Sequence, residues 1–135
     1  MVQAENQNPP QINPMHIILE GQVPSQKNDK VIAVNKRTGK RFPMTSKAVK
    51  AWQEDVAIQL KSYKGCADGK VTIAYQFYVK DDRRRDLTNM IQSVEDALVR
   101  AGLIKDDAWQ FVALGGADAE IDREHPRCEL WIEED

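Results

Sequence analysis

The clearest hydrophobic pattern in the chain is a strict alternation of apolar and other side chains over residues 71–79. Because successive side chains of a β-strand point to opposite faces, this run predicts a strand with one buried face. Residues 128–132 alternate in the same way, and the short apolar runs at 16–19 and 111–114 predict two further strands.

Apolar residues at helical spacing predict two helices. Thr45 or Ser46 is expected to cap the first of them. The second is expected at about residues 87–101, with Asp86 as its N-cap and Gly102 as its left-handed stop. The apolar positions are Val49, Trp52, Val56 and Leu60 in the first helix and Leu87, Met90, Ile91, Val94 and Leu98 in the second.

Basic residues are concentrated between the first strand and the first helix. The apolar run 31–34 and the pair Arg41-Phe42 flank the polar residues 35–40, which predicts a hairpin or long loop with a basic tip. The charges that sum to −2 are therefore unevenly distributed: this segment forms a local positive surface, and an acidic segment over residues 115–135 balances it. A basic hairpin that is simply solvated explains this cluster equally well.

The order of these elements predicts one α+β domain, in which two main helices pack on a single mixed β-sheet. The length of 135 residues suits one domain. Residues 1–14 are polar and contain three prolines, so we expect a flexible N-terminal arm followed by a domain over residues 15–135. No leader pattern or membrane-length apolar run is visible, so a cytoplasmic protein is expected, with Cys66 and Cys128 as reduced, partly buried thiols.

Charged side chains are densest over residues 81–89, where the alternating strand passes into the second helix. Helix capping explains Asp86 about as well as chemistry does. The arginines at 83–85 have a similar simple explanation as a solvated strand end, but neighbouring guanidinium groups also suit phosphate oxygens.

A second acidic group, Asp106 and Asp107, follows the expected helix stop. The spacing does not determine whether the chain returns Asp107 to Asp86, and an acidic turn is the simpler interpretation. If it does return, carboxylates would meet beside arginines, an oxygen-rich arrangement that suits Mg²⁺ or Mn²⁺. No P-loop or dinucleotide fingerprint is present, so no organic cofactor is expected, and Trp52 is better explained as core than as a base-stacking platform.

Taken together, these motifs resemble a known enzyme family. The segment Asp82-Arg83-Arg84-Arg85-Asp86-Leu87-Thr88-Asn89 is followed at fixed spacing by Asp96-Ala97-Leu98, Ala101-Gly102 and Asp106-Asp107. This order is similar to the core of the RusA-type Holliday junction resolvases over residues 82–110. The resemblance implies a RusA-like fold, a homodimer and Mg²⁺-dependent cleavage of branched DNA, as in bacteria and their phages.

The resemblance also assigns roles to residues. Asp86 matches the first aspartate of the family and Asp107 the late one, so these two are expected to hold Mg²⁺, with Mn²⁺ as a substitute. Asn89 and Asp106 are further catalytic candidates. The residues expected to contact DNA phosphates are Lys36, Arg37, Lys40, Arg41, Arg83, Arg84 and Arg85.

Two positions depart from the family pattern. Thr88 stands where the family has a second aspartate, and Gln92 stands where it has a lysine. Asp106, Asp81, Asp82 or Asp96 are candidates to restore the lost ligand. Asp96 is the poorest of them, because it lies about 15 Å beyond Asp86 along the helix and is better placed to pair with Arg100.

Two other functions remain open at this point. One alternative to the nuclease is a junction-binding protein that lost its chemistry at Thr88 and Gln92. The other is a protein-interaction module that uses its acidic C-terminal surface. The first binds junctions without cutting them, and the second shows no salt-sensitive binding of DNA.

Overall fold

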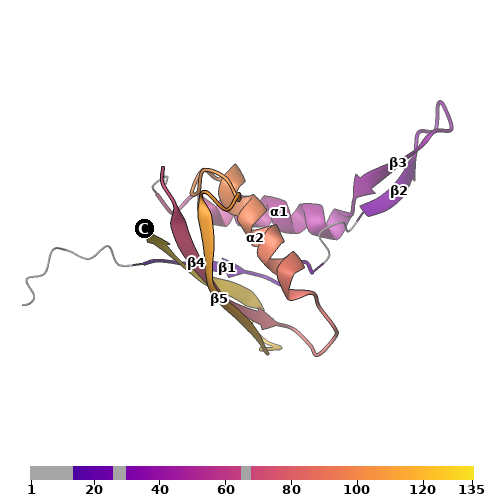
Figure 1. The fold of residues 1–135 in the computed structure, drawn as a ribbon. Helices are drawn as coiled ribbons and strands as arrows, with labels where there is room; N and C mark the ends of the chain where they lie inside the picture. Colours follow the sequence, from indigo (N-terminus) through magenta and orange to yellow (C-terminus); the bar gives the residue numbers. More distant parts are fainter. Residues whose placement is uncertain (1–13, 26–29, 65–67) are drawn as a thin grey trace, which may run out of the picture.

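The protein is described here from a computed structural model, which places residues 14–25, 30–64 and 68–135 (Figure 1). The N-terminal arm expected at residues 1–14 lies almost wholly outside these residues, as does Cys66. The elements are, in chain order, β1 (Met15–Glu20), β2 (Lys30–Val34), β3 (Arg41–Thr45), α1 (Lys47–Leu60), β4 (Val71–Val79), α2 (Leu87–Arg100), β5 (Val112–Ile121) and β6 (Arg127–Glu134).

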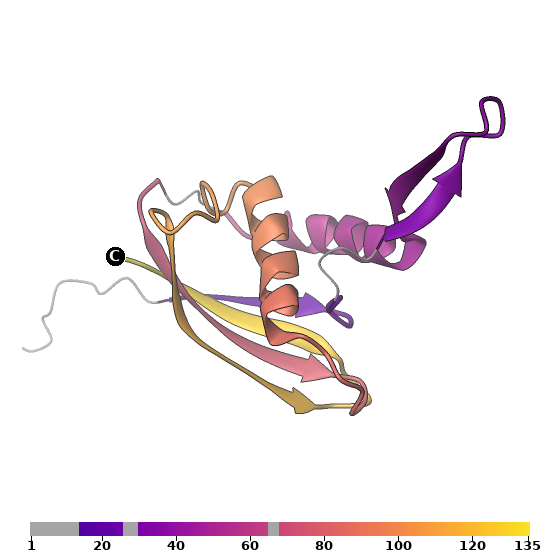
Figure 2. The same ribbon diagram turned by 45° about the vertical axis from the view of Figure 1, so that its right-hand side comes forward.

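Four of the strands form one mixed sheet in the order β1-β6-β4-β5. β6 pairs antiparallel with both β1 and β4, whereas β4 and β5 run parallel. Both helices lie over one face of this sheet (Figures 1 and 2). The predicted α+β fold with a mixed sheet and two helices is therefore confirmed.

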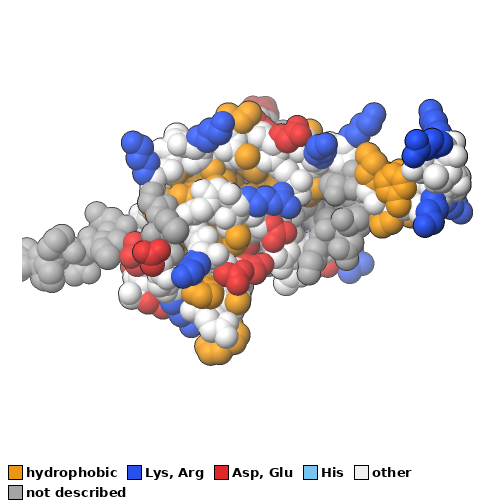
Figure 3. Space-filling view, turned by 90° about the horizontal axis from the view of Figure 1, so that it is seen from above, with side chains coloured by type: hydrophobic (Ala, Val, Ile, Leu, Met, Phe, Trp, Pro, Cys, Tyr) orange, Lys and Arg blue, Asp and Glu red, His pale blue; other side chains and the backbone are white. Residues whose placement is uncertain are grey.

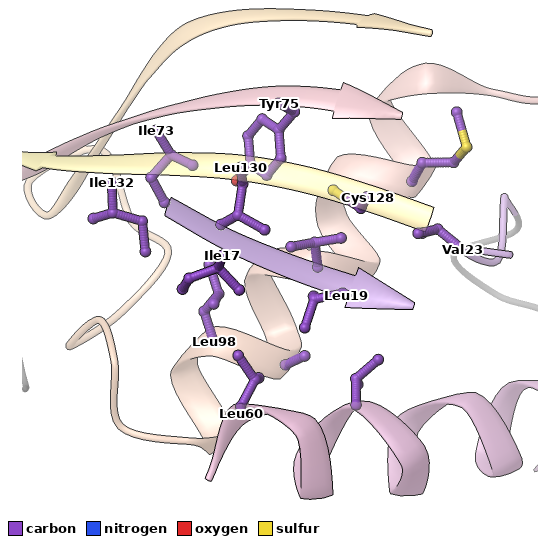
Figure 4. Packing of buried hydrophobic residues seen from close by; sticks show 14 of the residues in the cluster. Ile17, Leu19, Val23, Leu60, Ile73, Tyr75, Leu98, Cys128, Leu130 and Ile132 are labelled. Atoms are coloured by element: carbon purple, nitrogen blue, oxygen red, sulfur yellow. The ribbon is translucent and has the colours of Figure 1, made fainter. Parts of the chain in front are cut away.

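The core lies between the sheet and the two helices. Burial alternates strictly along β4, as its sequence predicted. Leu60 of α1 and Leu98 of α2 face the β1 residues Ile17 and Leu19 across this layer (Figure 4), and all four are almost fully buried. Cys128 of β6 is also buried, with a free thiol whose pKa is raised by burial.

The helix ends follow the expected capping chemistry. Of the two candidate caps of α1, Ser46 is the one observed, because its hydroxyl oxygen accepts a hydrogen bond from the Val49 amide. Gly102 adopts φ +78° just after α2, which is the left-handed stop predicted for it. None of the helices described is long and apolar enough to cross a membrane.

β5 is much longer than the predicted strand at 111–114. It continues to Ile121 because it pairs in parallel along the whole of β4, with a bulge at Gly115. A Cβ at Gly115 would lie 2.8 Å from the Thr72 side chain, so glycine is needed there. β5 is an edge strand with exposed residues along most of its length, and its sequence therefore lacks the apolar alternation of β4.

β2 and β3 form a separate two-stranded sheet, which confirms the predicted hairpin. The hairpin projects from the body at the end where α1 begins (Figures 1 and 2). Its turn is held by Asn35, whose side-chain oxygen accepts hydrogen bonds from the amides of Arg37 and Thr38. Among the hairpin side chains whose burial the structure describes, four large apolar ones are exposed: Ile32, Val34, Phe42 and Met44.

Candidate functional site

Asp86 occupies the N-cap of α2, but its side chain makes no capping hydrogen bond. Its two carboxylate oxygens instead accept hydrogen bonds from Thr88 Oγ1 and Asn89 Nδ2, each at 3.3 Å. Helix capping therefore does not account for this carboxylate. It is exposed and oriented by two side chains of the first turn.

Asp107 is brought to the side of α2 by the segment that follows the helix. Gln92 Nε2 donates a hydrogen bond to Asp107 Oδ2 at 3.0 Å. Asp106 Oδ1 accepts a hydrogen bond from the Asp107 amide at 2.8 Å, which fixes the local backbone. Asp107 is thus held beside Gln92 of α2, the helix whose N-cap is Asp86.

The same Gln92 amide nitrogen also donates to Asp96 Oδ1 at 3.0 Å. Asp96 was expected to pair with Arg100, but no ion pair joins these two residues. The Asp96 carboxylate instead accepts from Gln92, four residues before it, and the same amide bridges it to Asp107. Asp96 therefore lies beside Asp107.

The position of Asp107 relative to Asp86 is described by its partner Gln92. Gln92 lies six residues beyond Asp86, which is about 9 Å along the axis. The Gln92 amide that donates to Asp107 also donates to Asp96, four residues further along α2. No group of three or more His, Cys, Asp or Glu side chains forms a ready metal cluster within residues 14–25, 30–64 and 68–135. The sharing of one ion by Asp86 and Asp107 stays a prediction.

A further carboxylate, Glu95, stands close to this site and was not identified from the sequence. Tyr75 donates a hydrogen bond from its hydroxyl to Glu95 Oε2 at 3.1 Å. Partial burial, and then the negative charges of Asp107 and Asp96, raise the pKa of Glu95. In the sequence, the only indication that Glu95 belongs to the site is its position one turn after Gln92. That position becomes informative only once Asp107 is known to contact Gln92.

The three arginines before α2 differ in their surroundings. Arg85 is largely buried, forms an ion pair with Asp81 at 2.8 Å, and donates to the carbonyl oxygens of Asp81 and Arg83. It therefore holds the β4–α2 connection together. Arg83 is mostly exposed and lies 3.9 Å from Asp81, and Arg84 is exposed with no ion pair in the described chain.

The basic residues of the hairpin lie apart from the acidic ones. Lys36, Arg37, Lys40 and Arg41 are all exposed near its tip. Figure 3 shows lysine and arginine side chains at the far end of the hairpin, whereas the acidic side chains gather on the body. The hairpin nevertheless adjoins the start of α1 (Figure 2), and the start of α1 and the connection from β4 to α2 line one pocket.

The fold and the site together define a class. This is a small α+β protein with two exposed aspartates beside one helix, arginines just before that helix and a projecting basic hairpin, which is typical of enzymes that act on nucleic acids. The family model of the endodeoxyribonuclease RusA matches residues 13–133, so the chain belongs to the RusA endodeoxyribonuclease family. No curated protein matches the chain.

Proposed function

We propose that this protein is an Mg²⁺-dependent endonuclease that cleaves four-way junctions and related branched DNA, as a homodimer, in recombination and repair. The observation that carries the proposal is the hydrogen bond from Gln92 to Asp107. It ties Asp107, the second acidic residue of the expected pair, to the helix whose N-cap is the first, Asp86. The family match supports the same activity.

The donors present suit the proposed ion. Mg²⁺ is usually held by one or two carboxylates and keeps several waters, and Asp86 and Asp107 are both exposed carboxylates. When bound, Mg²⁺ polarises a phosphodiester and lowers the pKa of a bound water. Mn²⁺ takes the same oxygen ligands and is the expected substitute.

The remaining residues of the site orient these two carboxylates. Thr88 and Asn89 donate to the Asp86 carboxylate and Gln92 donates to that of Asp107, whereas Asp106 accepts from the Asp107 backbone amide and fixes the chain there. Thr88 thus keeps a polar contact where the family pattern has a carboxylate. Gln92 supplies no positive charge, so stabilisation of the phosphate in the transition state falls to Arg83 and Arg84.

The basic hairpin supplies contacts to the DNA backbone. Such contacts position a duplex without reading its sequence, which suits recognition by shape. Two identical sites related by a dyad fit the two symmetric cuts that a four-way junction needs.

The decisive experiment is cleavage of a synthetic four-way junction by Asp107→Asn. We expect this variant to lose Mg²⁺-dependent cleavage and to bind the junction at least as tightly as the unchanged protein, because repulsion of the phosphates falls. Asp118→Asn, an exposed aspartate of β5, is the matched control and should cut normally. Full cleavage by Asp107→Asn removes Asp107 from the mechanism.

The departures at Thr88 and Gln92 favour one second candidate, a junction-binding protein without nuclease activity. It shares the fold and the basic surface but lacks one carboxylate and one cation of the family pattern. A gel assay with and without Mg²⁺ distinguishes the two functions, since this candidate shifts the junction and never nicks it. If no salt-sensitive binding is seen at all, the chain is instead a protein-interaction module.

A further inference from the structure

An exposed indole stands beside the proposed cleavage site. Trp109 comes two residues after Asp107 and is 74% exposed, the highest value among the large apolar side chains of the described residues. Trp52, by contrast, is only 8% exposed and belongs to the core, as the sequence predicted. A single exposed apolar side chain is common on protein surfaces, so the meaning of Trp109 depends on how it is held and on what surrounds it.

The turn that carries Trp109 is fixed on both sides. The amide of Phe111 donates a hydrogen bond to the carbonyl oxygen of Ala108 at 2.8 Å, which closes a tight turn around Trp109. The carbonyl oxygen of Phe111 accepts from the Val71 amide at 2.9 Å, and residues 103–104 before the turn are buried in the core. The exposed ring is therefore held on a rigid segment, which reduces the ordering cost of binding.

Lysine side chains accompany the aromatic rings of this turn. Lys70 Nζ lies 5.7 Å from the centre of the Trp109 ring, and Lys105 Nζ lies 5.9 Å from that of Phe111. Lys105 is exposed and forms no ion pair within the described residues. Aromatic rings beside cations are the means by which proteins bind unpaired nucleic acid, because the bases stack on the rings and the cations attract the backbone. A purely apolar partner would instead leave these ammonium groups without solvation.

The separation of Trp109 from Asp107 suits a base of the DNA strand that is cut. Two residues of extended chain span at most about 7 Å, so the Trp109 backbone lies within this distance of Asp107. Successive nucleotides of one strand are about 3.4 Å apart along a duplex axis. The indole is therefore placed to meet a base within a few nucleotides of a phosphate bound at Asp107.

We propose that Trp109 stacks on a base at the branch point of the DNA and so restricts cleavage to phosphates next to the branch. Within a regular duplex both faces of each base are covered by its neighbours, and the indole finds no partner there. At a branch point the stack is interrupted, and a free base face accepts the indole in any sequence, because every base has a flat face. This inference rests on the proposed function, since it takes branched DNA to be the substrate.

The first test follows tryptophan fluorescence of the full chain while a synthetic four-way junction is added without divalent metal, so that no strand is cut. A base stacked on an indole quenches its emission. We expect the junction to quench more strongly than a linear duplex of the same length, and Trp109→Phe, which retains Trp52 and Trp131, to lose most of this difference. The proposal is overturned if the junction quenches no more than the duplex, or if Trp109→Phe responds as the unchanged protein does.

Affinity tests the same contact independently. Trp109→Ala is expected to weaken binding of the junction about tenfold with little effect on the linear duplex, whereas Trp109→Phe retains a stacking ring and most of the affinity. The matched control is Ile58→Ala, which removes an equally exposed apolar side chain from α1 and should leave both affinities unaltered. Unchanged junction affinity in Trp109→Ala, or an equal loss for the duplex, contradicts the proposal.

The outcome is separable from that of the proposed nuclease. A protein whose Trp109 fluorescence responds to the junction but that never cuts it keeps the stacking contact and loses the nuclease. A protein that cuts junctions normally while Trp109→Ala binds and cuts them equally well keeps the nuclease and loses the stacking contact. Gel filtration of Trp109→Ala addresses a second copy of the chain as the occupant, because a variant that loses its dimer together with its junction affinity assigns Trp109 to the interface and overturns the proposal.

Discussion

Gln92 donates from a single amide nitrogen to the carboxylates of Asp96 and Asp107. The neutral Gln92 amide takes over part of the role of the lysine in the family pattern, because it holds the carboxylates of Asp96 and Asp107 in a defined arrangement. What it does not supply is a positive charge near the phosphate. The residue is therefore best regarded as a positioning residue for Asp107.

Replacement of Gln92 tests this role. Gln92→Met keeps the length of the side chain and removes both hydrogen bonds, so Asp107 loses its anchor. Displacement of a catalytic group by about 1 Å costs about 100-fold in rate. We expect kcat for junction cleavage to fall by about 10- to 100-fold, with little change in junction affinity.

Gln92→Lys is the informative companion variant. The ammonium group retains a donor between the two carboxylates and adds the charge that the family pattern has, so cleavage should be at least as fast as in the unchanged protein. Equal activity in Gln92→Met and the unchanged protein would show that Asp107 needs no anchor.

Glu95 gives a prediction about pH. Because its pKa is raised in the folded protein, the folded state binds a proton more tightly than the unfolded state does. Stability should therefore decrease as the pH rises above about 4.5 through the raised pKa, and the cost should persist at neutral pH. Glu95→Gln keeps an acceptor for Tyr75 and removes this cost.

We accordingly expect Glu95→Gln to have a higher urea midpoint than the unchanged protein at pH 7, and a similar one at pH 4. Urea titrations at several pH values measure this difference. A midpoint at pH 7 that is lowered would mean that the negative charge of Glu95 is stabilising in the folded state.

At the scale of elements, the bulge of β5 is held by a close approach. Thr72 Cγ2 would lie 2.8 Å from a Cβ at Gly115, and rotation of Thr72 would disturb the hydrogen bond from its hydroxyl to Asp135. Gly115→Ala is expected to destabilise the protein by about 1–3 kcal/mol in urea unfolding, as overpacking does.

Two comparisons make that prediction specific. Gly69→Ala meets no atom within 4 Å and should stay within about 0.5 kcal/mol of the unchanged protein. Gly115→Ala should cost less stability when it is introduced into Thr72→Ala than when it is introduced into the unchanged protein, because the clashing methyl group is then gone. An unaltered midpoint for Gly115→Ala would show that the bulge relaxes freely.

The elements that could be predicted from the sequence were those with strong local periodicity. β4 and α2 each bury one complete face, so their patterns are visible without knowledge of their neighbours. The far half of β5 could not be predicted, because its structure depends on pairing with β4 and on a glycine bulge. The contact of Gln92 with Asp107 depends on the path of a loop, and no local pattern encodes that path.

For the molecule as a whole, the far end of the projecting hairpin carries lysine and arginine side chains, whereas the body carries side chains of both signs (Figure 3). If the hairpin binds DNA, each phosphate it neutralises releases a counterion and steepens the salt dependence of binding by about one unit of slope. Replacing Lys36, Arg37, Lys40 and Arg41 by glutamine should therefore flatten a plot of log K against log salt by about two to four units.

The control for that experiment is Lys61→Gln/Lys64→Gln, at the other end of α1, which should leave the slope within about one unit. If the slope is unaltered in the variant with all four hairpin substitutions, the DNA contacts lie on another surface. Filter binding or fluorescence anisotropy at several salt concentrations provides the measurement.

The sheet also has a consequence for assembly. β5 forms one open edge, and unpaired strand edges are where foreign strands add and aggregates begin. Here the edge carries a bulge at Gly115 and two acidic side chains, Asp118 and Glu120. A second copy aligned along it would bring like charges together. Continuous sheet formation across two molecules is thus disfavoured at β5.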